Sequence, residues 1–178
     1  MRVNEDLSPV AGFLPVTADR LRDAMSELPA GVSILTTTDE DGRPRGATIS
    51  AVTSLSLEPA LLLVCLDQHS ETLSALSQGH RFLLHIVAEG QEATAYALAR
   101  KSHDKFDDVE WRPKHGGLPF IEGCTIAFLC TVETLFPGGD HVIVVGRIER
   151  VAQDDARVPL VYHRRRMIAS PVVAMSGV

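Results

Sequence analysis

The sequence predicts a mainly β protein, an antiparallel barrel with helices packed on its outside. Short segments rich in Val, Ile, Thr and Leu recur along most of the 178 residues, as strands do. Turn sequences such as Asp41-Gly42 join several of them as hairpins. Only two or three helical segments are interspersed, and this mixture favours a barrel over a parallel sheet.

The length of the chain fits one domain with a substantial core. Residues 1–16 lack periodicity, so we expect an extended N-terminal arm there. Thr17 is a good N-cap for a helix over residues 18–28, whose apolar residues fall on one face. The domain is predicted to cover residues 17–170, and residues 171–178 are predicted to be a tail.

The remaining elements are predicted from apolar periodicity and from the turn residues between them. Residues 102–123 contain many Gly and Pro and are predicted to be irregular. Strands are expected over residues 32–38, 45–52, 60–67 and 81–88, and Ser70 is expected to cap a short helix between the last two of these strands. A helix over residues 90–101 and a long hairpin of residues 124–136 and 141–153 are expected after them.

Charge and hydropathy exclude several classes of function. The net charge of −6 disfavours a nucleic-acid partner, since such proteins cluster Lys and Arg. The one dense basic run, residues 164–166, makes a local anion site at most. No apolar stretch reaches the ~18 residues that span a bilayer, so no membrane association is expected. The N-terminus has no secretory apolar segment, and we expect a cytoplasmic protein.

No metal site or protein nucleophile is expected. Cys65 and Cys130 lie in apolar runs, where cysteine behaves as a small hydrophobic residue, and Cys124 has no C-x-x-C partner. The seven histidines fall in no ligand spacing. Glycine-rich phosphate loops are absent, so any bound phosphate is not held at a glycine-rich helix start.

The segment GATISAVTSLSLEP, residues 46–59, combines small residues with hydroxyls between two apolar runs. One interpretation is a half-exposed strand, which β-branched Thr and alternating Ser suit. The other is that a ligand with many hydrogen-bonding atoms lies along this backbone, because small side chains let it come close.

Six segments in order resemble the flavin reductase-like proteins of the FMN-binding split-barrel fold. Between Leu21 and Tyr162 they are LPAGVSILTT, GATISAVTSLSLEPALLLVCLDQHSET, RFLLHIV, KSHDKF, Trp111 with GLP, and PGGDHVIVVGRIE. The resemblance implies an antiparallel Greek-key split β-barrel that forms a homodimer. It also implies an NAD(P)H-dependent flavin reductase, which transfers a hydride from NADH or NADPH to FAD or FMN. Such reductases supply free reduced flavin to a separate monooxygenase.

The resemblance also implies which residues form the site. The residues that match cofactor-binding positions are Thr48, Ile49, Ser50 and Ala51 at the isoalloxazine edge, Ser54, Leu55 and Ser56 beneath the ribityl chain, Asp67, Ser70 and Thr72 near the ribityl hydroxyls and phosphate, Lys101 as a phosphate counter-charge, and Phe106. His141 matches the family histidine on the nicotinamide side and is the expected catalytic residue.

The sequence leaves several alternatives open. A non-catalytic flavin carrier or sensor could use the same barrel, and oxidase chemistry on a pyridoxal-like substrate is a weaker third reading. Two positions depart from the family: His85 stands where Asn is common, and Met167 where an aromatic is common. His85 could be a hydrogen-bonded barrel residue, and residues 164–166 could be a solvated face or a pyrophosphate contact.

Overall fold

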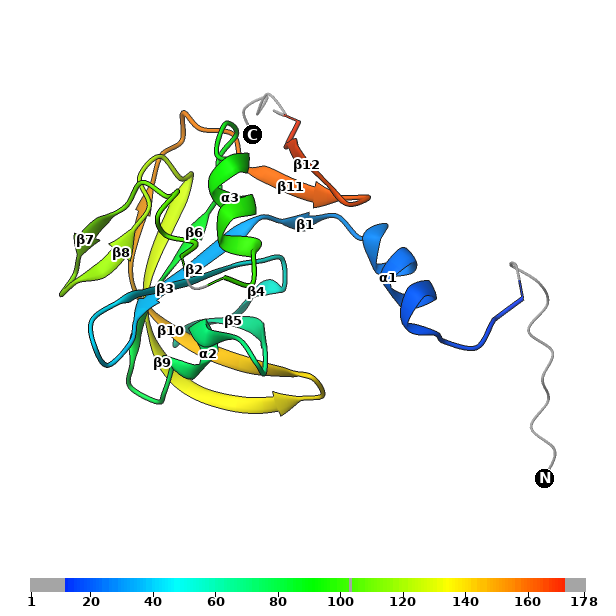
Figure 1. The fold of residues 1–178 in the computed structure, drawn as a ribbon, viewed down its shortest axis with the longest axis horizontal. Coiled ribbons are helices and arrows are strands. Elements are labelled where there is room, and N and C mark those ends of the chain that lie inside the picture. Colours follow the sequence, from blue (N-terminus) through cyan, green and yellow to red (C-terminus); the bar gives the residue numbers. More distant parts are fainter. Residues whose placement is uncertain (1–11, 103, 172–178) are drawn as a thin grey trace.

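A computed structural model describes residues 12–102 and 104–171, so much of the predicted arm over 1–16 and nearly all of the predicted tail over 171–178 lie outside the described residues. The fold is an antiparallel barrel with α3 (Glu92–Ala99) packed on its outside (Figure 1). This confirms the predicted fold class. None of the helices in the described residues has the length and apolar character needed to cross a membrane.

The barrel is one seven-stranded sheet in which every neighbouring pair is antiparallel. Its strands are β2 (Ser33–Thr38), β3 (Pro44–Ile49), β4 (Val52–Leu57), β5 (Ala60–Asp67), β6 (Arg81–Ile86), β9 (Ile126–Gly138) and β10 (His141–Gln153). Their order in the sheet is β3-β2-β6-β9-β10-β5-β4. The predicted hairpins of β2 with β3 and of β9 with β10 are both present.

Two smaller sheets were not predicted. One joins β1 (Ala30–Gly31) to β11 (Leu160–His163) and β12 (Arg166–Ala169). The other is the hairpin of β7 (Arg112–Lys114) and β8 (Leu118–Phe120), inside the segment that we expected to be irregular.

The two edge strands of the large sheet, β3 and β4, follow each other directly in the chain. The predicted strand over 45–52 is therefore interrupted, because the chain turns at Ser50 and Ala51. The Val52 amide donates to the Ser50 carbonyl, and the Cys65 amide donates to the Ala51 carbonyl, each at 3.0 Å. This turn brings the end of edge strand β3 next to the start of edge strand β4. We call residues 47–52 the seam of the barrel.

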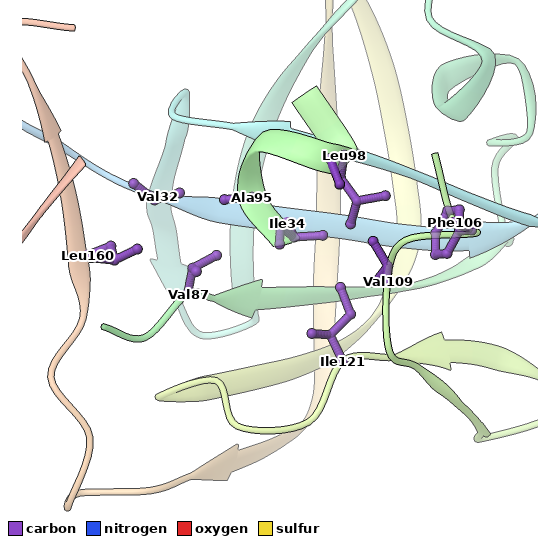
Figure 2. Close-up of a cluster of buried hydrophobic side chains, with 10 residues drawn as sticks. Val32, Ile34, Val87, Ala95, Leu98, Phe106, Val109, Ile121 and Leu160 are labelled. Carbon is purple, nitrogen blue, oxygen red and sulfur yellow. The ribbon is translucent and has the colours of Figure 1, made fainter. Parts of the chain in front are cut away.

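Helix α3 lies close to the barrel because two of its three buried residues are alanines. Ala95, Ala97 and Leu98 are buried, and Figure 2 shows Ala95 and Leu98 among side chains from β2 and from the segment before β9. The Thr48 hydroxyl donates to the Ala95 carbonyl at 2.6 Å. This bond ties the helix to β3 beside the seam.

Two glycines in strands are required by aromatic rings packed on them. A Cβ at Gly46 of β3 would lie 2.9 Å from a ring atom of Phe106 and 3.1 Å from the Leu35 carbonyl oxygen. A Cβ at Gly146 of β10 would lie 2.5 Å from a ring atom of Phe82 in the barrel core. Phe106 therefore holds the segment after α3 against β3.

His85 is a buried barrel residue with both ring nitrogens hydrogen-bonded, as the sequence analysis suggested. The Ile121 amide donates to its Nε2 at 3.3 Å, so Nδ1 carries the proton and donates to the Ile34 carbonyl at 3.2 Å. Burial lowers the pKa of His85 to about 4. The ring is neutral in the folded protein at neutral pH.

Helix α1 (Ala18–Ser26) lies outside the barrel, and none of its residues is buried (Figure 1). The Arg20 amide donates to the Thr17 hydroxyl at 3.3 Å, which confirms the predicted cap. The helix is held by the basic run: Arg164 pairs with Glu27 at 2.8 Å, and Arg165 pairs with Asp23. These two arginines thus bind a helix, and neither residue lines the cavity described below.

Candidate functional site

A cavity of about 430 Å³ lies beside the seam. The seam forms one wall, and the others come from the end of β5, the start of α2 (Glu71–Ser74), the segment after α3 and the first residue of β10. Eight of the predicted site residues line it: Thr48, Ile49, Ser50, Ala51, Asp67, Ser70, Lys101 and His141. Residues predicted from distant segments thus come together at one place.

Five predicted residues do not line the cavity. Ser54, Leu55 and Ser56 lie on the edge strand β4, and the Leu55 side chain is 47% exposed on the surface. Thr72 is buried in α2, and its hydroxyl has no hydrogen-bond partner among the described residues. Phe106 belongs to the core cluster beneath α3. Its contact with the site is indirect, through Gly46.

At the seam, the groups available to a ligand are backbone N–H and C=O groups rather than side chains. Strand β3 ends the sheet, so its outer edge carries backbone N–H and C=O groups that no neighbouring strand of the described sheet pairs. Ser50 and Ala51 are small and exposed, so a flat ligand can approach these groups closely. The Thr48 hydroxyl is already used by Ala95, which leaves the backbone of this wall as the ligand-facing part.

The end of β5 carries a fixed negative charge. The Asp67 carboxylate accepts the His69 amide at 2.8 Å and pairs with Lys101 Nζ at 3.3 Å. The His69 bond, and after it the Lys101 charge, lower the pKa of Asp67. A second cation, Lys105, is half-buried in the same cavity, and its burial lowers its pKa while the nearby Glu71 raises it.

His141 stands at the mouth of the cavity, directly opposite Asp67 in the β10–β5 register. Its Nδ1 is 2.7 Å from a carboxylate oxygen of Asp140, which orients the ring. The bond from His141 lowers the pKa of Asp140, so this carboxylate stays charged. Asp140 lies in the tight turn between β9 and β10, and His141 is the first residue of β10.

Sequence reasoning missed about half of the lining. The residues it did not single out are Ala47, Cys65, Leu66, His69, Glu71, Leu98, Ala99, Arg100, Ser102 and Lys105. Most of them adjoin a predicted residue in the chain, so the segments were recognised and the individual side chains were not. The inner face of α3 could have been found from its run of small residues.

The other cysteines have no exposed reactive thiol. Burial raises the pKa of Cys124 and of Cys130 to about 12, so neither forms a thiolate at neutral pH. For Cys130 this fits the predicted role of a small hydrophobic residue.

Comparison with known proteins decides the family. A family model described as "Flavin reductase like domain" matches residues 25–169, which is most of the chain. The chain belongs to the flavin reductase-like family. Several relatives of this family member are named as reductase components or subunits of flavin-dependent monooxygenases.

Three similar proteins illustrate the family. The chain is 37% identical over 149 residues to the actinorhodin polyketide dimerase of Streptomyces coelicolor, covering 84% of each chain. It is 36% identical over 160 residues to a flavin reductase (NADH) of Kitasatospora aureofaciens, covering 88% of this chain and 84% of the other. An NADH:FAD oxidoreductase of Streptomyces globisporus, solved in complex with NAD and FAD fragments, superposes with a TM-score of 0.81 at 29% identity, covering 93% of this chain and all of the other.

The residues present fit a flavin. The cavity volume lies within the range of about 300–1,000 Å³ typical of small-molecule sites. One wall offers a free backbone edge, which suits the hydrogen-bonding rim of an isoalloxazine ring. Lys101 and Lys105 supply positive charge for a phosphate in the same cavity.

Proposed function

We propose that this flavin reductase uses NADH or NADPH to reduce FAD or FMN in the cavity beside the seam, and that the reduced flavin passes to a separate monooxygenase. The observation that carries the proposal is the meeting of a free strand edge, two lysines and His141 around one cavity. The names of the reductase relatives support the reaction and the kind of partner.

The chemistry belongs to the flavin, whose ring accepts a hydride from a nicotinamide when both are bound. The protein's part is to hold and orient. The backbone of Ser50 and Ala51 would hold the polar rim of the ring, and Lys101 with Lys105 would attract the phosphate. His141 at the mouth would bind the nicotinamide and keep it over the open side of the ring, which is an orientation effect.

The experiment is a flavin-dependence test on the purified protein. NADH oxidation, followed by the near-ultraviolet absorbance of the reduced nicotinamide, should require added FAD or FMN. No flavin-dependent oxidation with either nicotinamide would refute the proposal. A tightly retained flavin together with indifference to both nicotinamides would favour the carrier or sensor.

The His141 assignment has its own test. His141→Ala should raise the nicotinamide KM or slow flavin reduction, while the flavin Kd changes little. His115→Ala, in the β7–β8 turn and outside the cavity, is the control and should leave both unchanged. Weakened flavin binding with normal reduction would count against the assignment.

We also propose that the protein is a homodimer whose second copy covers the outer face of β9, β10 and β5. Ile143 of β10 is paired in register with Phe136 of β9 on one side and with Cys65 of β5 on the other, so the three side chains lie in one row on this face. Phe136 is 52% exposed, and Cys65 lines the cavity. A partner on this apolar row would therefore close the cavity from the side. The cytoplasmic location stays a prediction.

A further inference from the structure

An ion pair joins two residues that line the cavity in the region where the flavin phosphate is expected. Lys101 follows α3, and Asp67 ends β5, so their pair at 3.3 Å joins two walls that are distant in sequence. Both residues line the cavity. The lysine that would attract a phosphate is therefore already paired with a carboxylate of the protein, although its side chain is 91% exposed.

The carboxylate cannot easily turn away from this position. Its other oxygen accepts the His69 amide at 2.8 Å, in a turn that the Ser70 amide closes on the Asp67 carbonyl at 2.9 Å. These bonds also keep Asp67 ionised, as its lowered pKa reflects. A phosphate that approached Lys101 would meet this fixed negative charge.

The second cation of the cavity is compensated in a similar way. Lys105 lies near the carboxylate of Glu71, which Arg45 also binds at 3.1 Å. Both lysines thus face protein carboxylates before any ligand enters. Like charges a few ångströms apart repel even at the effective dielectric of a protein surface, so the carboxylates weaken phosphate binding.

We propose that Asp67 competes with the flavin phosphate for Lys101, and that this competition keeps the flavin exchangeable. The inference rests on the proposed function and adds to it: flavin is a substrate that enters and leaves, and Asp67 is a residue that sets its affinity. The effect must depend on the charge of the phosphate rather than on the ring.

The three natural flavin forms separate these contributions. Riboflavin has no phosphate, and FMN carries a phosphate monoester that is largely dianionic above a pKa of about 6. The two phosphates of FAD each carry one charge, so the charge nearest Lys101 is smaller than in FMN. A variant that removes the competing charge should therefore strengthen FMN binding most, FAD binding less and riboflavin binding hardly at all.

The test is the Kd of each flavin, measured by quenching of flavin fluorescence, for the wild type and for Asp67→Asn. Asparagine keeps an oxygen that can accept the His69 amide, so the turn is preserved while the charge is lost. We expect the FMN Kd to fall about tenfold, the FAD Kd to fall by less, and the riboflavin Kd to stay within about twofold. FMN should also dissociate more slowly in stopped flow.

Asp154→Asn is the matched control. Asp154 likewise accepts an amide two residues on, that of Ala156 at 3.1 Å, and pairs with a cation, Arg157, at 3.1 Å, but it does not line the cavity. It should leave all three Kd values unchanged.

An equal change for riboflavin and FMN, no change for FMN, or weaker FMN binding in Asp67→Asn would each overturn the inference. The last result would make Asp67 a flavin ligand instead. These outcomes are distinct from failure of the proposed function, which would appear as a wild type without flavin-dependent NADH oxidation. If the wild type reduces flavin but Asp67→Asn does not strengthen FMN binding more than riboflavin binding, the inference is wrong and the proposed function stands.

Discussion

Thr48 was predicted to lie at the isoalloxazine edge, and in the structure its hydroxyl donates to the Ala95 carbonyl of α3. Thr48→Val should lower the free energy of unfolding by about 1 kcal/mol, because one hydrogen bond to the helix is lost. Thr48→Ser should retain most of it. Urea unfolding measures the difference, with the flavin Kd measured in parallel. A large loss of flavin affinity at unchanged stability would show that the hydroxyl contacts the ligand after all.

His85 makes the stability of the barrel depend on pH. Its pKa falls from 6.5 in the unfolded chain to about 4 in the folded protein, so the unfolded chain binds the proton first. The contribution is fully present above pH 6.5 and is lost as the pH falls from 6.5 toward 4, by about 3 kcal/mol in total.

The measurement is the free energy of unfolding between pH 7.5 and 4.5 for the wild type and for His85→Asn. Because the asparagine does not titrate, the variant should lose less stability over this interval than the wild type. Parallel curves for the two proteins would contradict the assignment of this pH dependence to His85.

At the scale of elements, Gly46 links the core to the site. Gly46→Ala should force the Phe106 ring away, since the new Cβ would lie 2.9 Å from it, and should destabilise the protein by about 1–3 kcal/mol. The displaced segment also carries Ser102 and Lys105 of the cavity, so flavin binding should weaken as well.

Gly146→Ala is the matched comparison for this prediction. It creates a similar conflict with Phe82, but in the barrel core and away from the cavity lining. It should destabilise without a comparable loss of flavin affinity, as shown by chemical unfolding and flavin titration. Equal losses of flavin affinity in both variants would mean that Gly46→Ala weakens flavin binding only because it destabilises the whole fold.

Sequence patterns predicted elements with strong local signals and missed those that depend on the rest of the fold. The β9–β10 hairpin follows from its apolar runs and the turn between them. The β11–β12 hairpin turns at Arg164 and Arg165, both with positive φ (49° and 62°). Arginine rarely adopts such a φ, so the local sequence does not predict this turn. The break at Ser50 was likewise invisible, because it is set by the meeting of two distant sheet edges.

The site shows the same division. The small residues of the seam left a half-exposed strand and a ligand-binding backbone as alternatives, and the resemblance to the family favoured the second. Ser54, Leu55 and Ser56 do not line the cavity because the turn at Ser50 sends β4 along the edge of the sheet. Lys105 lines the cavity and precedes Phe106, whose packing on Gly46 is a contact between distant segments that no local pattern indicates.

At the scale of the molecule, the proposed dimer predicts that Phe136→Glu yields a monomer with weakened flavin binding, because a charge would enter the apolar row. Val151→Glu is the control: Val151 is similarly exposed, at 60%, but lies toward the far end of β10. Light scattering coupled to size exclusion gives the masses. A monomeric wild type, or a Phe136→Glu dimer with normal flavin affinity, would contradict the proposal.

The order of strands around the barrel has a consequence for how the protein responds to damage. Strands β3 and β5 face each other across the cavity, yet β2, β6, β9 and β10 separate them in the sheet. Flavin affinity therefore depends on the correct pairing of all the strands between β3 and β5. A shift of register in any of these pairs would change the shape of the cavity and lower the affinity. Conversely, a bound flavin that contacts both β3 and β5 should raise the melting temperature, because it binds only the folded protein.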